Sequence, residues 1–155
     1  MSAAAHAVAP ARLVHTSLFG VLEVPEAQLL HFADGLCGFR ECRQWVLIDG
    51  RKRGTSWLQS ADQSELAFLL VDPFVIHEGY GVDLAPSDLT RLAADQATEL
   101  VVLVIVTLPR TSDEPATANL QGPVVINARL RTGAQIVLGE GAGSVRHVFS
   151  LAFLV

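Results

Sequence analysis

Short apolar runs rich in β-branched and aromatic residues recur along the whole chain, separated by Gly, Pro, Asp and Ser. Runs of this length and composition are typical of β-strands. Residues 66–71 and 100–108 are apolar at almost every position, which indicates strands that are buried on both faces. Residues 147–153 alternate between two kinds of side chain, as a strand with one buried face does. The predicted strands are 18–24, 28–32, 45–48, 55–59, 66–71, 100–108, 117–120, 124–127, 134–138 and 147–153.

One segment has a clear helical pattern. Pro86, Ser87 and Asp88 are residue types that begin helices, and Leu89, Leu92, Ala93 and Gln96 follow at helical spacing. We therefore predict one short-to-medium helix over residues 87–96. Many strands with a single helix predict a mainly β fold, namely a small antiparallel β-barrel or sandwich with the helix covering one end.

The length of 155 residues predicts one domain, and a chain of this size buries about two-thirds or more of its surface. The Ala-rich start predicts a flexible tail over residues 1–12, followed by a single domain over residues 13–155. That start lacks the basic residues and continuous apolar core of a signal peptide. The longest apolar run, 100–108, is about half as long as a membrane span requires. We therefore expect a cytoplasmic protein with no membrane association.

The balance of charges is acidic, with a formal net charge of −5 and a sequence pI of about 5.4. Nucleic-acid-binding proteins usually present a basic face, because contacts with phosphates supply much of their affinity. Arg51, Lys52 and Arg53 form a basic cluster, which suits a solvated turn better than a phosphate site. We predict no direct binding to nucleic acid. An acidic chain is well suited to meeting a basic protein partner.

The sequence contains no recognisable arrangement of catalytic or metal-binding residues. Cys37 and Cys42 have a spacing unlike that of zinc or redox motifs, and the five histidines form no ligand pair. We expect two free thiols packed near Phe39 and Trp45. No catalytic, cofactor-binding or metal-binding residue is therefore predicted, and the chain is not expected to be an enzyme.

Residues 117–127 carry the most information about function. Asn119 and Asn127 flank a Gly122–Pro123 break and the β-branched run 124–126. We expect a strand, a turn in which Gly122 takes a backbone angle closed to other residues, and a second strand. The two asparagines can bond free backbone groups of the turn, or they can belong to a partner-binding surface.

This segment resembles the T-x-N-L-x-(A/G)-P-(I/V)-(V/I)-(I/V)-N box of the flagellar assembly factor FliW family. Residues 32–39 are similar to the F-x-x-G-L-P-G-F loop of that family, with Cys37 where the family usually has Pro. The resemblance extends in order from about residue 18 to residue 138. Its other parts are 19–26, 57–60, Phe68, 71–73, Tyr80 and 133–138.

The resemblance implies a small β-barrel-like fold and a non-enzymatic regulator with two protein partners. One is flagellin, and the other is the carbon storage regulator, an RNA-binding repressor of flagellin translation. Asp72 either caps the turn that follows it or contributes to a partner site with Tyr80, and Gln121 is expected to be more exposed than the asparagines. The predicted partner-binding residues are Asp72, Pro73, Tyr80, Asn119, Gln121, Pro123 and Asn127.

Other functions are compatible with the same residues. A β-barrel can bind a small ligand at its mouth, and Asp72, His77, Glu78 and Tyr80 lie close together in the sequence. A flagellin chaperone that does not act on the repressor is a second alternative, and a structural adaptor is a third. In each case we expect a monomer.

Overall fold

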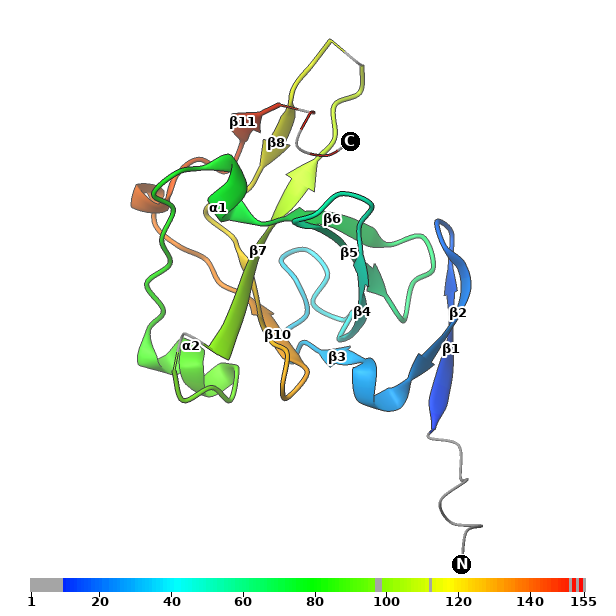
Figure 1. Cartoon of the computed structure of the whole chain (residues 1–155). Helices are drawn as coiled ribbons and strands as arrows, with labels where there is room; N and C mark the ends of the chain where they lie inside the picture. The colour runs from blue at the N-terminus through cyan, green and yellow to red at the C-terminus, as the bar shows by residue number, and fades with distance from the viewer. Residues whose placement is uncertain (1–9, 97–98, 112, 151, 153, 155) are drawn as a thin grey trace, which may run out of the picture.

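The pairing of β7 with both β6 and β9 closes a sheet into a small barrel (Figure 1). The computed structural model describes residues 10–96, 99–111, 113–150, 152 and 154. Within them, seven strands form the closed barrel. These are β3 (Leu30–His31), β4 (Gln44–Asp49), β5 (Thr55–Ser60), β6 (Ala67–Val71), β7 (Leu100–Thr107), β9 (Val124–Asn127) and β10 (Thr132–Gln135).

The mainly β, barrel-like fold predicted from the sequence is confirmed. Neighbouring strands of the barrel are antiparallel except β3 and β10, which pair in parallel through His31 and Thr132. The barrel is therefore mixed rather than purely antiparallel. Two further strands extend β7 beyond the barrel, namely β8 (Ala116–Ala118) and β11 (His147–Phe149).

Side chains fill the interior of the barrel. Trp45, Phe32 and Leu58 are fully buried there, and the indole Nε1 of Trp45 donates to the Cys42 carbonyl oxygen at 2.9 Å. Trp57 alternates with Leu58 along β5 and is partly exposed on the outside of the barrel.

A hairpin of β1 (Ala11–Thr16) and β2 (Gly20–Pro25) packs on the outside of the barrel (Figure 1). Its buried side chains Val14 and Val24 contact Leu29 and Val46. The first strand begins at Ala11, so it includes two residues of the segment 1–12 expected to be a tail, and residues 1–9 lie outside the described part.

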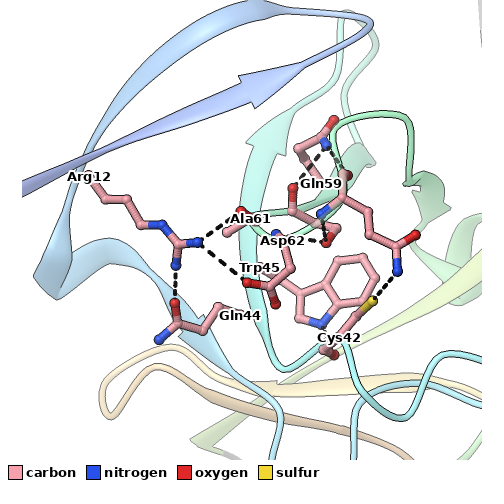
Figure 2. A network of polar contacts seen from close by, with 9 residues as sticks. Arg12, Cys42, Gln44, Trp45, Gln59, Ala61 and Asp62 are labelled. Atoms are coloured by element: carbon pink, nitrogen blue, oxygen red, sulfur yellow. Dashed lines mark hydrogen bonds and ion pairs between the residues drawn. The ribbon is translucent and has the colours of Figure 1, made fainter.

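Arg12 attaches this hairpin to the barrel (Figure 2). Its guanidinium donates to the Gln44 side chain, to the Ala61 carbonyl oxygen at 3.0 Å and to the Asp62 carboxylate at 3.4 Å. The neighbouring amide of Gln59, fully buried, donates to the Ser60 carbonyl oxygen at 3.0 Å. Arg12 thus bonds to β4 and to the residues that follow β5, which fixes the position of β1 on the barrel.

The predicted helix is shorter in the structure. Helix α2 (Pro86–Arg91) begins as expected. It ends at Arg91, five residues before the predicted end at Gln96. Ala93 has a φ of 53°, and the amide of Ala94 donates to the Leu89 carbonyl oxygen at 2.9 Å. This left-handed residue closes the helix in the manner usually provided by glycine.

The remaining helical segments are short. A second α-helix, α1 (Pro73–Ile76), follows β6, and single 3-10 turns lie at η2 (Glu26–Gln28) and η4 (Glu140–Ala142). Helix α1 lies near the end of β7 that carries β8 and β11, and α2 lies near the opposite end (Figure 1). No helix among the described residues is both long enough and apolar enough to cross a membrane.

Most predicted strand boundaries shift by one or more residues. Strand β3 is shorter than the predicted segment 28–32, because η2 occupies its start. Strands β8 and β10 each begin earlier and end earlier than predicted. Strand β11 ends at Phe149, and residues 151 and 153 of the predicted strand 147–153 lie outside the described part.

Both cysteines are free thiols, as predicted. Cys42 is buried beside Trp45, and burial, the largest cause, together with the charge of Glu41 raises the pKa of its thiol. Cys37 is exposed, so the expectation that both thiols are packed is wrong for Cys37. The tight turn that begins at Leu36 carries Cys37 outward.

Candidate partner-binding surface

The segment between β8 and β9 does not reverse the direction of the chain. Both strands pair antiparallel with β7, where Ala118 lies opposite Val106 and Val124 lies opposite Leu103. Strands β8 and β9 therefore run in the same direction along one side of β7, and residues 119–123 form the loop between them. The Asn119 amide donates to the Ile105 carbonyl oxygen at 3.0 Å, which keeps the loop attached to β7.

Asn119 shapes this loop with its side chain. Its Oδ1 accepts from the backbone amides of Gln121 and Gly122, each at 3.1 Å, which is the side-chain turn expected of asparagine. The φ angle of Gly122 is not in the left-handed region, so the predicted reason for glycine is wrong. A Cβ at Gly122 would lie 2.9 Å from Nε2 of Gln135 and 3.0 Å from Nδ2 of Asn119, so these side-chain amides would have to move.

Gln135 on β10 links the loop 119–123 to the loop that contains Cys37. Its Nε2 donates to the Gly122 carbonyl oxygen at 3.0 Å, and its Oε1 accepts from the Cys37 amide at 2.9 Å. The buried Pro123 lies beside this link, and its carbonyl oxygen accepts from the Ile136 amide at 2.9 Å. Two segments of the family resemblance are thus joined by one side chain.

Asn127 holds the end of α2 against the barrel. It is fully buried, and its Nδ2 donates to the carbonyl oxygens of Leu92 at 2.9 Å and Ala93 at 3.4 Å. Its Oδ1 accepts from the Leu130 amide at 3.2 Å. The side chain therefore satisfies carbonyl groups that the end of the helix leaves without an intrahelical donor.

Asp72, Pro73 and Tyr80 together position α1. The carboxylate of Asp72 accepts from the Phe74 amide at 2.9 Å and caps the helix, in which Pro73 is the buried first residue. The Tyr80 hydroxyl donates to the Leu120 carbonyl oxygen at 2.7 Å, which connects α1 to the loop 119–123. The structural role considered for Asp72 is therefore present.

Gln121 is half-buried like Asn119, and it is more exposed than the fully buried Asn127. The side-chain Nε2 of Gln121 donates to the Gly143 carbonyl oxygen at 2.8 Å. The backbone carbonyl oxygen of Gln121 accepts from the Leu138 amide at 2.7 Å. All seven predicted partner-binding residues thus make internal contacts, six of them around α1 and the loop 119–123 and Asn127 at the end of α2. Direct contact of their side chains with a partner stays a prediction.

Asp72, Pro73 and Tyr80 support two exposed apolar side chains that the sequence analysis missed. Phe74 is 56% exposed and Val75 is 49% exposed, and both lie on α1. The Phe74 ring packs edge-on against the Tyr80 ring, with ring centroids 5.8 Å apart. We call Phe74 and Val75 the α1 platform. An apolar pair directly after Asp-Pro at a helix start was the signal available in the sequence.

Two histidines, His77 and His147, lie beside α1. Among the residues that the structure describes, no three His, Cys, Asp or Glu side chains gather closely enough to hold a metal ion. His77 and His147 lie with ring centroids 5.0 Å apart, and Nε2 of His147 lies 3.1 Å from the Ile76 carbonyl oxygen. These rings pack α1 against β11.

Tyr80 provides a direct test of this packing, because it is the one tyrosine of the chain. Burial raises the pKa of Tyr80 to about 12. The folded protein should therefore keep the proton between pH of about 10, where an unfolded tyrosine ionises, and pH of about 12. Stability should fall as the pH rises through that window, because only the unfolded chain loses the proton there.

The measurement is an ultraviolet titration of phenolate in the native protein and in the urea-unfolded chain. We expect midpoints near pH 12 and near pH 10, respectively. Tyr80→Phe should abolish the signal and remove this part of the pH dependence of stability. A native midpoint equal to that of the unfolded chain would show that the hydroxyl is open to solvent.

Comparison with known proteins gives a consistent result. The model of the family described as "FliW protein" matches residues 13–149. The flagellar assembly factor FliW of Moorella thermoacetica is 38% identical over 135 residues, which cover 86% of this chain and 85% of the relative. That of Treponema denticola is 34% identical over 134 residues, which cover 86% of this chain and 90% of the relative.

A solved structure agrees with these relatives. The crystal structure of the flagellar assembly factor FliW superimposes with a TM-score of 0.81 at 31% sequence identity, and the match covers 88% of this chain and 96% of that one. The family match includes β1 from Leu13 onward, the loop 119–123 and both helices. This chain therefore belongs to the FliW family of flagellar assembly factors.

Proposed function

We propose that this chain is a non-enzymatic cytoplasmic regulator that binds flagellin and antagonises the carbon storage regulator. When flagellin accumulates, it occupies the protein; when flagellin is exported, the released protein binds the repressor and restores flagellin synthesis. Family membership supports the role in flagellar assembly. The two partners come from the family resemblance.

The observation that carries the flagellin part of the proposal is the α1 platform. An unassembled filament subunit exposes apolar surface that the filament later buries, so its binding partner needs apolar side chains in contact with solvent. Phe74 and Val75 meet that requirement. Asp72, Pro73 and Tyr80 hold them in place before binding, which reduces the entropy lost on association.

The charge of the chain supports the repressor part. A protein that binds messenger RNA presents a basic surface to the phosphates. The net charge of −5 attracts such a surface and repels RNA itself. The protein therefore acts on the repressor and not on the transcript.

The flagellin part is tested by the double variant Phe74→Ser, Val75→Ser. We expect its affinity for purified flagellin to fall at least about tenfold, because apolar side chains at the centre of an interface dominate its binding energy. Isothermal titration calorimetry measures the affinity, and thermal melts show whether the fold is retained. Leu13→Ser is the matched control, since Leu13 is 61% exposed on β1 and lies away from α1.

Unchanged flagellin affinity in a folded double variant would place the flagellin contact elsewhere. Equal losses of flagellin affinity in the double variant and in Leu13→Ser would indicate non-specific hydrophobic association rather than a defined binding site. The repressor part needs a separate mixture of labelled flagellin leader RNA, repressor and this protein. Release of the RNA by this protein is expected, and an intact complex at saturating protein would leave only a flagellin chaperone.

A further inference from the structure

A basic groove lies on the side of the barrel formed by the loop 33–43, the end of α2 and the end of β10. It has a volume of about 530 Å³. Three of the eleven Lys and Arg residues of this acidic chain, Arg40, Arg43 and Arg91, line it together with one carboxylate, Asp34. We call this feature the basic groove.

The loop that forms one wall is tightly constrained. The amide of Phe39 donates to the Leu36 carbonyl oxygen at 2.8 Å, and Leu36 is buried in the barrel core. Gly35 has a φ of 60°, and the loop passes so close that a Cβ there would lie 2.3 Å from the Phe39 carbonyl oxygen. The backbone of Cys37 is bonded to Gln135 at 2.9 Å. Arg40 therefore extends from a preformed wall.

Carboxylates of the chain pair with only one of the three arginines of the groove, among the residues that the structure describes. Arg91 contacts the Asp34 carboxylate at 2.9 Å and the Asp88 carboxylate at 3.9 Å. Within the described part of the chain, the guanidinium groups of Arg40 and Arg43 have neither an ion-pair partner nor a hydrogen-bond acceptor. Both residues are exposed. The groove thus keeps a local excess of positive charge on a negative protein.

An apolar side chain completes the groove. Val137 follows β10, lines the groove and is 75% exposed. A ligand that fits must therefore offer negative groups to the two free guanidinium groups and an apolar group to Val137. The planar fork of a guanidinium matches a carboxylate with two parallel hydrogen bonds.

We propose that the basic groove binds an acidic peptide segment of a protein partner, with carboxylates on Arg40 and Arg43 and an apolar side chain on Val137. A short segment with alternating acidic and apolar residues satisfies both features. A nucleic acid satisfies them less well, because the charge of −5 repels a long polyanion and none of the described residues that line the groove is aromatic and able to stack on a base. This site is additional to the α1 platform.

The test uses the full chain and a fluorescein-labelled peptide of sequence Glu-Asp-Leu-Glu-Asp-Leu-Glu. Fluorescence anisotropy measures its affinity for the native protein and for the double variant Arg40→Gln, Arg43→Gln. We expect binding that weakens with added salt, and at least about a tenfold loss of affinity in the double variant. Because neither guanidinium supports the fold, the thermal melt should be unchanged.

The matched control is the double variant Arg110→Gln, Arg146→Gln, which removes the same charge from a different hollow of the surface. It should bind the peptide as the native protein does. Equal weakening in both double variants would reduce the effect to net charge and overturn the site. A Gln-Asn-Leu-Gln-Asn-Leu-Gln peptide that binds equally well would also overturn it.

Cys37 provides an independent reporter, because it lines the groove and is exposed while Cys42 is buried. Iodoacetamide should alkylate Cys37 selectively, and saturating peptide should slow that alkylation at least several-fold, as followed by mass spectrometry. An unprotected Cys37 during peptide binding would place the peptide elsewhere. Tighter binding of a labelled single-stranded RNA of equal charge, lost in the Arg40 and Arg43 double variant, would assign the groove to nucleic acid instead.

Discussion

Gly35→Ala should lower the free energy of unfolding by about 2–5 kcal/mol, which combines the cost of a left-handed non-glycine residue with that of overpacking. The new Cβ would lie 2.3 Å from the Phe39 carbonyl oxygen and 2.8 Å from the Arg40 backbone. Backbone atoms cannot rotate away as a side chain does, so the loop itself must move. Urea denaturation followed by tryptophan fluorescence measures the change.

Gly38→Ala is the control in the same loop. Gly38 has a φ of 86°, but a Cβ there meets nothing within 4 Å, so only the backbone strain of about 1–2 kcal/mol remains. We expect Gly35→Ala to cost clearly more than Gly38→Ala and to weaken peptide binding in the basic groove. Equal costs would show that the loop relaxes freely and that its close packing around Gly35 carries no energy.

Asn127→Ala should destabilise the protein by about 2–4 kcal/mol, because it removes a buried side chain and leaves buried backbone groups without partners. The Leu130 amide loses its acceptor, and the Ala93 carbonyl oxygen loses its donor. The Leu92 carbonyl oxygen keeps a bond from the Thr132 hydroxyl at 3.0 Å, which limits the loss. Thermal and urea unfolding measure the change.

Two other substitutions make the Asn127 result specific. Asn127→Asp keeps the shape but places a carboxylate against the two carbonyl oxygens, so it should cost at least as much as Asn127→Ala. Asn119→Ala should cost about 1 kcal/mol, because Asn119 is half-buried and bonds only turn amides. Tolerance of Asn127→Asp would mean that the amide donor is not what holds α2.

The loop 119–123 and the strand after it connect the two surfaces proposed to meet partners. Tyr80 joins the loop to α1 through the Leu120 carbonyl oxygen, and Gln135 joins it to the wall of the basic groove. Asn127 joins β9 to the end of α2, which carries Arg91. Tyr80 and Asn127, which belong to the family resemblance, therefore help to position α1 with Phe74 and the end of α2 with Arg91, which do not belong to it.

The amino-acid sequence by itself determined the class of fold and the family. Alternating and continuous apolar runs specify strands because burial of one or both faces depends on side chains that are neighbours in the sequence. The start of α2 was predictable for the same reason, since Pro86 and Asp88 act within one helical turn. The ordered motifs from residue 18 to residue 138 identified the family that comparison confirmed.

Only the tertiary structure decided which residues meet across the barrel. Three contacts illustrate this, namely the parallel pairing of β3 with β10, the bond from Asn127 to Leu92 and the bond from Tyr80 to Leu120. They join positions between 35 and 101 residues apart. A pattern within a short stretch of sequence does not predict which distant residue is the partner. Closure of the barrel also placed Trp57 outside and brought Arg40, Arg43 and Arg91 to one groove. Such contacts depend on the path of the whole chain, because each one needs two residues that are far apart in the sequence.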